Sequence, residues 1–350
     1  MRIAQIAPLT EAVPPKLYGG TERVVSFLTE ELVSMGHDVT LFASGDSVTR
    51  AQLEPMHPCA LRFDRSLRDA IAPHMLMLEK VARRADEFDV LHCHLDYWSF
   101  SLFTRLDTPF VTTMHGRLDL PEHAPVYDYF SDTPLVSISD AQRAPLPNAP
   151  FIATVQHGLP AGLLTPQRVP QRYLAFLGRI CPEKRVDRAI RIARATGIPL
   201  KIAAKVDRVD QEYFETTIRP MIDGTFIQHI GEINDAEKPE FLSGAIALLM
   251  PIDWPEPFGL VMIEAMACGT PVIAYNWGSV PEVIEDGLTG FIVDDEAGAC
   301  AAVQRVGSLS RQAIRRRFEQ RFTARRMAED YIMLYRRLVA RARPALRAVT

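Results

Sequence analysis

The chain has 350 residues, of which 47% are hydrophobic and 23% are charged, and it carries a formal net charge of −4. This length leaves room for two domains, and the composition is that of an ordinary soluble globular protein. The slight negative charge excludes a general attraction to nucleic acid. No apolar run reaches the roughly 18–20 residues that a membrane-spanning helix needs. The first ten residues predict a strand rather than a signal sequence, so we expect a cytosolic protein.

The five cysteines are odd in number, far apart in the sequence and never in C-x-x-C spacing. This pattern predicts reduced thiols that serve mostly as small buried residues.

The first 155 residues alternate between short apolar strands and helices. Helices are predicted at 21–36 and 71–86, and residues 45 to about 67 lack a clear pattern. Because strands that alternate with helices form right-handed crossovers, this order predicts a parallel, doubly wound sheet. The predicted strands lie at 2–7, 38–44, 89–94, 109–114, 135–139 and 152–155.

A glycine pair, Gly19-Gly20, stands between the first predicted strand and the first predicted helix. Glycines at the carboxyl end of a strand let a phosphate approach the backbone. The segment is neither G-x-G-x-x-G nor a P-loop, so an ordinary turn remains the alternative.

Three polar side chains alternate along the third predicted strand: His92, His94 and Asp96. They would share one face, which allows a metal site. No further cluster of ligands is evident, so local hydrogen bonding at a strand end is the favoured interpretation. His115 ends the next strand, just before a glycine, where catalytic groups lie in open parallel sheets. A buried structural histidine is the alternative there.

The second half repeats the same alternation after a segment at 158–170 that contains proline and glycine without periodicity. We therefore place the boundary there, with domains at 1–165 and 166–326. Its strands are predicted at 173–177, 200–204, 225–230, 245–250, 271–275 and 291–293.

The most informative stretch is 251–282, which contains two glutamates with seven residues between them. Pro255 and Pro257 keep Glu256 in a loop, because proline does not fit inside a helix. Glu264 falls on a helix predicted at 259–268.

The backbone amides of Phe258, Gly259 and Leu260 would point out of the N-terminus of that helix, where a phosphate is favoured. Two carboxylates on either side of a phosphate site suit a ligand with hydroxyls on both sides of its phosphates, such as a nucleotide sugar.

This stretch resembles the donor-site signature of the retaining glycosyltransferases of family four, which have the GT-B fold. Residues 256–272 read EPFGLVMIEAMACGTPV and residues 278–282 read GSVPE, which match most of the family's pattern. The resemblance covers nearly the whole chain. It implies an α/β fold of two Rossmann-like, doubly wound parallel-sheet domains that face each other across a cleft. It also implies that a C-terminal helix at 327–350 crosses back to the first domain.

The resemblance also implies roles for individual residues. Arg179 and Lys184 would grip the donor diphosphate, because fixed cations stabilise a departing diphosphate. Glu256 would bind hydroxyls of the donor sugar, and Glu264 the ribose. The remaining donor contacts would be Gly19 and Gly20 at the phosphate, His115 beside the transferred sugar, and His229, Ile230 and Gly231 at the nucleobase.

Three features temper or depart from this pattern. An ordinary strand-end turn is the alternative for the stretch that begins at His229. The family has glycine after the lysine, where this chain has Arg185. It also has Asn-Gly where this chain has His157-Gly158.

The predicted reaction moves a hexose from a UDP-, GDP- or ADP-sugar to a hydroxyl of a glycan, lipid or small molecule, with the anomeric configuration retained. No D-x-D sequence occurs, so we expect neither a divalent metal nor another cofactor. One rival is an epimerase or hydrolase of the same shape, which would consume the donor without an acceptor. Another is a non-catalytic binding protein for sugar nucleotides, which a degenerate glutamate or lysine would indicate.

From residue 305 onward the chain is predicted to be helical and rich in arginine. A solvated face is the favoured interpretation, and peripheral contact with anionic lipid at the inner membrane face is the alternative. The arginines are Arg315, Arg316, Arg317, Arg321, Arg325, Arg326, Arg336 and Arg337.

Overall fold

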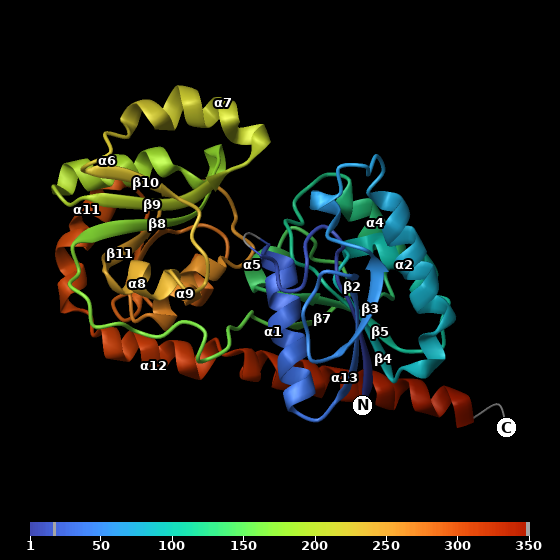
Figure 1. Ribbon diagram of the computed structural model, residues 1–350. Helices are drawn as coiled ribbons and strands as arrows, with labels where there is room; N and C mark the ends of the chain where they lie inside the picture. Colours follow the sequence, from blue (N-terminus) through green and yellow to red (C-terminus); the bar gives the residue numbers. More distant parts are fainter. Residues whose placement is uncertain (17–18, 348–350) are drawn as a thin grey trace. The chain divides into compact units, whose positions relative to one another are not determined.

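The computed structural model describes residues 1–16 and 19–347, shown in Figure 1. The chain divides into two compact units. The first unit comprises Met1–Gly158 and Ala324–Thr350, and the second comprises Leu159–Thr323. The boundaries predicted from the sequence, after residues 165 and 326, compare with observed boundaries after Gly158 and Thr323.

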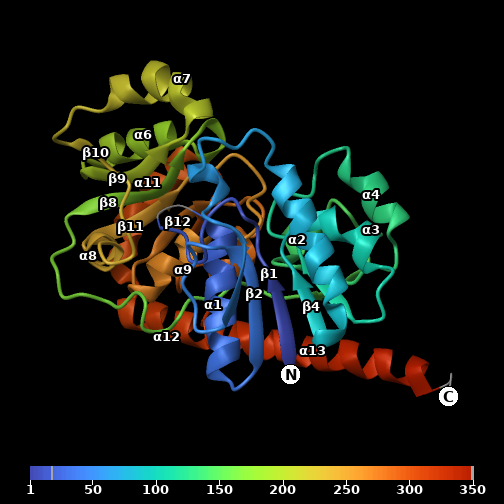
Figure 2. The same cartoon turned by 45° about the vertical axis from the view of Figure 1, so that its right-hand side comes forward.

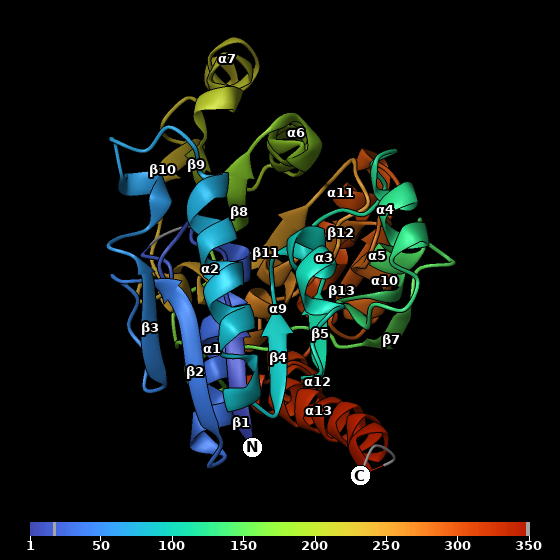
Figure 3. The ribbon, with the colours of Figure 1, turned by 90° about the vertical axis from the view of Figure 1, so that its right-hand side faces the viewer.

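The first unit contains a seven-stranded sheet in the order β3-β2-β1-β4-β5-β6-β7, and all its pairs are parallel. Figure 3 shows most of these strands side by side, from β3 to β7. The order places the reversal of winding between β1 and β4. The strands are β1 (Arg2–Ile6), β2 (Asp38–Ser44), β3 (Gln52–His57), β4 (Val90–Cys93), β5 (Phe110–Thr113), β6 (Leu135–Ser137) and β7 (Phe151–Thr154).

Helices cover both faces of the first sheet, as Figure 2 shows for α1 on one face and for α2 and α3 on the other. Two separate apolar clusters lie beneath them: one joins α1 to β2, and the other joins α2 and α3 to β1 and β4. The long helix α13 packs beside α1. The helices are α1 (Gly20–Ser34), α2 (Ile71–Arg83), α3 (Phe100–Phe103), α4 (His123–Tyr129), α5 (Asp140–Arg143) and α13 (Ala324–Arg347).

The second unit contains a six-stranded parallel sheet in the order β10-β9-β8-β11-β12-β13. It has its own apolar core, which α6 and α11 cover from one side. In Figure 1, α8 and α9 lie on the opposite side of this sheet. The strands are β8 (Tyr173–Ile180), β9 (Leu200–Val206), β10 (Ile227–Gly231), β11 (Ala245–Met250), β12 (Val272–Tyr275) and β13 (Gly290–Val293).

The helices of the second unit alternate with its strands, as a doubly wound sheet requires. They are α6 (Val186–Thr196), α7 (Gln211–Tyr213), α8 (Lys238–Ser243), α9 (Leu260–Ala267), α10 (Val280–Val283), α11 (Glu296–Arg305) and α12 (Arg311–Arg321).

Both sheets have the Rossmann strand order, with a switch point where the winding reverses. In the first unit this point lies between β1 and β4, and in the second unit it lies between β8 and β11. Ligands bind at the carboxyl ends of the strands beside such a point. The loops that follow β1 and β4 in the first unit, and β8 and β11 in the second, are therefore the candidate ligand-binding loops.

Two details of the predicted first and second sheets were wrong. The stretch predicted as patternless contains β3, an edge strand, and it tolerates Pro55 because only one of its sides pairs with a neighbour. The strand predicted to end at residue 177 continues to Ile180, because Gly178, Arg179 and Ile180 pair with β9. Arg179 therefore lies on a strand.

The arginine-rich C-terminal region is largely occupied by contacts within the protein. Arg317 and Arg321 both pair with Glu285, while Arg315 donates to the backbone carbonyls of Ala161, Leu164 and Ala267. Arg325 and Arg326 pair with acids one turn further along α13. These contacts leave few of the arginines for an external anion. Within the described residues no helix has the length and apolar character to cross a bilayer.

Candidate functional site

The loops after β8 and β11 bring a lysine and a glutamate together at the switch point of the second unit. Lys184 ends the short turn Pro182–Lys184 that follows β8, and Glu256 lies in the loop that follows β11. The Nζ of Lys184 forms a close ion pair with Oε2 of Glu256, and only 21% and 11% of the two side chains are exposed. Because the two side chains are mostly buried, the electrostatic attraction between them is stronger than in an ion pair at the surface.

Trp254 completes this pair, and the sequence interpretation missed it. Its indole Nε1–H donates to Oε2 of Glu256 over 3.1 Å, and Nζ of Lys184 lies 4.8 Å from the centre of its ring. The indole therefore orients the carboxylate and also attracts the ammonium through its ring face. The only signal in the sequence was a tryptophan two residues before the glutamate.

The two parts of the signature, residues 256–272 and 278–282, pack directly against each other. The amide of Ser279 donates to the carbonyl of Glu256 over 2.9 Å, and its hydroxyl donates to the carbonyl of Phe258 over 2.9 Å. Gly278 has φ of +58°, and a Cβ there would lie 2.3 Å from the backbone nitrogen of Glu256. The second part of the signature thus fixes the backbone that carries the first glutamate.

The helix α9 starts where the amide site was predicted. Gly259 precedes it in the left-handed region with φ of +77°, and a Cβ there would lie 2.7 Å from Cε of Met262 and 3.3 Å from Cγ of Glu256. The left-handed conformation favours glycine here, and the missing Cβ leaves room for the side chains of Met262 and Glu256. The glycine thus brings the N-terminus of α9 against Glu256.

Glu264, on α9, is 4% exposed and is paired with a lysine that the sequence interpretation missed. Nζ of Lys238 lies 2.7 Å from Oε1 of Glu264 and 3.0 Å from Oδ1 of Asp235. Lys238 is the first residue of α8. The sequence pattern for this helix is weak, because the helix has only six residues and contains a proline. The lysine between two acids thus holds the carboxylate of Glu264 in place.

Arg179 is surrounded by acids instead of standing with Lys184. Its guanidinium lies 2.8 Å from Glu183, 3.4 Å from Asp207 and 3.8 Å from Asp210. Burial, with the nearby charges of Glu183 and Asp207, raises the pKa of the Asp210 carboxyl, and Arg179 opposes that rise. In this arrangement Arg179 organises the turn that leads to Lys184, because Glu183 is the residue before it.

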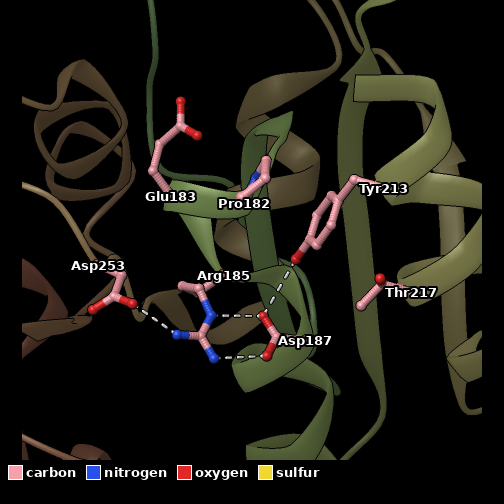
Figure 4. A pocket seen from close by; sticks show the side chains of 7 residues that line it. All are labelled: Pro182, Glu183, Arg185, Asp187, Tyr213, Thr217 and Asp253. Atoms are coloured by element: carbon pink, nitrogen blue, oxygen red, sulfur yellow. Dashed lines mark hydrogen bonds and ion pairs between the residues drawn. The ribbon is translucent and has the colours of Figure 1, made fainter. Parts of the chain in front are cut away.

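Arg185 occupies the position at which the family has glycine, and it has the backbone conformation of a glycine, with φ of +52°. Its guanidinium bonds both carboxylate oxygens of Asp187 and also reaches Asp253, as Figure 4 shows. These contacts offset the cost of a left-handed conformation, which is about 1–2 kcal/mol for a residue with a Cβ.

The same side chains line an open hollow of about 540 Å³. Figure 4 shows Tyr213 directed toward Asp187 across it. The hollow does not include Lys184, Glu256 or Glu264, so it is distinct from the predicted donor contacts. Its lining residues are Pro182, Glu183, Arg185, Asp187, Tyr213, Thr217 and Asp253.

The predicted nucleobase contacts end β10. Nε2 of His229 contacts the carbonyl oxygen of Ala204 over 2.8 Å, and its ring packs on Phe214. Ile230 is 43% exposed, and Gly231 has φ of +80°. A fixed histidine beside an exposed isoleucine leaves a strand-end surface that a flat ring could cover.

The predicted residues of the first unit also lie beside its switch point. Gly19 caps α1 and packs against Pro15, since a Cβ there would lie 2.8 Å from Cβ of Pro15. Gly20 is the first residue of α1. His115 follows β5, and its ring stacks on that of His157 with 5.3 Å between the ring centres.

His92 and His94 hydrogen-bond to side chains far away in the sequence, among them Gln5, Thr113 and Tyr335, rather than to local groups at the strand end. Among the residues that the structure describes, no group of three histidines, cysteines or acids is placed to hold a metal ion. Burial raises the pKa of the Asp96 carboxyl to about 6, and this residue has φ of +47°.

The sequence of this chain matches two protein-family models. Residues 18–190 match the model described as Glycosyltransferase Family 4, and residues 165–324 match the model described as Glycosyl transferases group 1. The chain belongs to the family-four-like glycosyltransferases. The two matches overlap and together span both units of this glycosyltransferase.

A curated relative and two solved structures support this assignment. Glycogen synthase of Mycobacterium tuberculosis is 27% identical, over 84% of this glycosyltransferase and 83% of the relative. Sucrose-phosphate synthase from Thermosynechococcus elongatus has a TM-score of 0.80 at 20% identity, over 97% and 99% of the two chains. HepE from Anabaena, solved in complex with UDP and glucose, has a TM-score of 0.74 at 16% identity, over 97% and 100%. The fold is GT-B.

Proposed function

We propose that this glycosyltransferase moves a hexose from a nucleotide-diphosphate sugar to an acceptor hydroxyl, retains the anomeric configuration and needs no metal ion. The observation that carries the proposal is the Lys184–Glu256 pair at the switch point of the second unit, next to the N-terminus of α9. Lys184 supplies charge for a diphosphate, and Glu256 supplies an acceptor for sugar hydroxyls.

The phosphate side of the proposed site is cationic without a metal. Lys184 is the ammonium nearest to Glu256, and the positive end of the α9 dipole adds to its field. As the bond between the anomeric carbon and the diphosphate breaks, negative charge grows on the departing oxygen. Fixed positive groups stabilise that charge most in the transition state, which is why they speed the reaction.

Glu264 is suited to bind the ribose of the nucleotide. Its carboxylate is held by Lys238, so it meets a ligand already oriented, and a charged acceptor forms strong hydrogen bonds with hydroxyl donors. One helical segment, α9 with the loop before it, thus carries an acid for each of the two sugar rings.

In the proposed reaction the acceptor oxygen bonds to the anomeric carbon on the face from which the diphosphate leaves. The acceptor's proton passes to an oxygen of the leaving diphosphate, so atoms and charges balance without a side-chain base. HepE, solved with UDP and glucose, supports a nucleotide-sugar donor for a protein of this fold.

The test is a transfer assay with an EDTA-treated enzyme and panels of nucleotide sugars and acceptors, followed by determination of the anomeric configuration in the product. Lys184→Ala and Glu256→Ala should each lower the transfer rate by at least roughly a hundredfold, because each removes a group that acts on the reacting centre. Lys201→Ala is the matched control, since Lys201 packs on Tyr173 on the same unit. Full activity in both site variants would refute the assignment.

The rival activity is hydrolysis or epimerisation of the donor. It can be distinguished from sugar transfer by measuring donor consumption with and without an acceptor. The rival predicts equal donor consumption with and without acceptor. The proposal predicts that consumption rises steeply when a suitable hydroxyl compound is added.

A further inference from the structure

A chain of buried hydrogen bonds in the first unit runs from His115 to the helix α13. Nε2 of His115 lies 2.9 Å from Nδ1 of His94, and Nε2 of His94 lies 2.8 Å from Oε1 of Gln5. Nε2 of Gln5 lies 3.2 Å from the hydroxyl of Tyr335. That hydroxyl lies 2.6 Å from Nδ1 of His92.

The far end of the chain continues to a second tyrosine of α13. Nε2 of His92 lies 2.7 Å from Oγ1 of Thr113, which lies 2.8 Å from the hydroxyl of Tyr331. Gln5, His92, Thr113 and both tyrosines are at most 1% exposed, and His94 is 3% exposed. Most of these hydrogen bonds are therefore inaccessible to water, so each buried polar group depends on its neighbour in the chain as a hydrogen-bond partner.

Two arrangements of protons satisfy the bonds that join Gln5, His94 and His115, and they run in opposite directions with opposite orientations of the Gln5 amide. Neutral imidazole has one N–H and one acceptor nitrogen, so the choice at one ring decides the next. With the oxygen of Gln5 accepting from His94, His94 is protonated at Nε2, and its Nδ1 accepts from Nε2–H of His115. This order does not fix the tautomer of His92, because the hydroxyl of Tyr335 can either donate to Nδ1 of His92 or accept from it. In the reverse order the three rings are all protonated at Nδ1.

One atom decides between the two orders. Nδ1 of His115 is buried and has no hydrogen-bond partner among the described residues. In the reverse order this atom would be an unpaired, buried N–H. Orphaned N–H donors are rarer in proteins than under-used acceptors, because a buried donor without a partner loses its hydration with no return. The first order leaves only a lone pair there.

We propose that Gln5 and His94 are positioning residues for His115, and that they hold its ring as the Nε2–H tautomer with an unprotonated Nδ1. Burial lowers the pKa values of all three rings, that of His115 to about 3, so the chain remains neutral at physiological pH.

The consequence for the reaction rests on the proposed function and on the place beside the transferred sugar that the family resemblance implies for His115. Positive charge develops at the anomeric carbon as the diphosphate departs. A neutral ring, with its remaining N–H committed to His94, places no cation and no competing donor beside that carbon. The bond to His94 also fixes the plane of the ring.

The direct test is nuclear magnetic resonance of the full chain with 15N-labelled histidine, which distinguishes the tautomers by their ring-nitrogen shifts. His94 and His115 should both be Nε2–H forms at pH 7.5. Nδ1–H forms at His94 and His115, or protonated rings, would overturn the proposal. This measurement does not depend on any enzymatic activity.

Two variants test whether Gln5 sets the order. Gln5→Met removes the acceptor of His94, so the signals of His94 and His115 should move toward the Nδ1–H form. Tyr335→Phe removes a partner further along and should leave both rings unchanged. An unchanged pattern in folded Gln5→Met would show that Gln5 has only a packing role, and would overturn the proposal.

The kinetic readout links this chain to transfer. Gln5→Met should lower kcat by roughly tenfold with little change in the donor KM, as expected when a group that fixes a histidine tautomer is lost. Tyr335→Phe should stay within about twofold of the natural protein. If the protein transfers no sugar at all, the proposed function fails while the tautomer pattern still stands or falls by itself.

Discussion

At the scale of single residues, two glycines with similar backbone angles differ in what surrounds them. Gly278 has φ of +58° and lies against the backbone of Glu256, whereas Gly287 has φ of +72° with nothing within 4 Å of an added Cβ. Conformation alone therefore disfavours alanine at both, but only Gly278 is also blocked by packing.

This pair gives the first prediction. Gly287→Ala should cost about 1 kcal/mol of unfolding free energy, the price of a left-handed alanine. Gly278→Ala should cost at least about 3 kcal/mol, since the loop must move, and should abolish most donor binding. Urea unfolding and donor titration measure both effects. Equal costs at the two sites would contradict the packing that we describe.

Single residues also show what the sequence could and could not predict. Glu256 and Glu264 were predictable because proline placement and helix spacing are local properties. Trp254 and Lys238 were missed, because their role depends on contacts between loops far apart in the chain. Arg185 departs from the family's glycine, and its contacts with Asp187 and Asp253, which accompany a left-handed backbone, could not be predicted from the sequence.

At the scale of elements, the strands were predicted better than the short helices. Buried parallel strands are nearly continuous apolar runs, which a reader of the sequence can find. The strand β3 was missed because it is an edge strand with a proline, and α4, α7 and α8 were missed because helices of three to seven residues show no clear period. Packing decides such short elements.

The link between α8 and α9 gives the second prediction. Lys238→Met alone should cost about 3–5 kcal/mol, because it leaves the buried carboxylate of Glu264 without its cation. Glu264→Gln alone should cost less, because Lys238 keeps its ion pair with Asp235. The double variant should recover much of the stability that Lys238→Met loses, since the carboxylate of Glu264 is then absent. It should still bind the donor poorly, because the carboxylate proposed for the ribose is absent. Recovery of donor binding in the double variant would show that Glu264 is only structural.

At the scale of the whole molecule, the buried histidines make the first unit sensitive to acid. Burial lowers the pKa values of His92, His94, His115 and His157 below the ordinary value near 6.5. The unfolded chain therefore binds more protons than the folded chain below pH 6.5. Stability is complete above that pH and falls as the pH drops.

The third prediction is the slope of that loss. Each such histidine can remove about 1.4 kcal/mol per pH unit below pH 6.5. The raised pKa values of Asp96 and Glu22 act in the opposite direction, but they are two groups against six, because burial also lowers the pKa values of His37 and His74. Urea unfolding followed by far-ultraviolet circular dichroism between pH 8 and 5 measures the sum. A first unit as stable at pH 5 as at pH 8 would contradict the neutral, buried chain.

The two units were predictable as doubly wound parallel sheets from the alternation of strands and helices, and the family comparison agrees with that fold. The order of the strands within each sheet could not be predicted from the sequence pattern. In the second sheet β8 and β11 are neighbours, so the loops that follow them lie side by side and bring Lys184 to Glu256.

The measurement that most directly tests the central claim is calorimetric titration of UDP-, GDP- and ADP-hexoses into the natural protein, Lys184→Ala and Lys201→Ala, all in EDTA. One nucleotide class should bind the natural protein and the Lys201 variant alike, and at least tenfold more weakly to the Lys184 variant, since a hydrogen bond to a charged group contributes about 1.5–3 kcal/mol. Equal affinity in all three proteins, or no binding until a metal ion is added, would contradict the account.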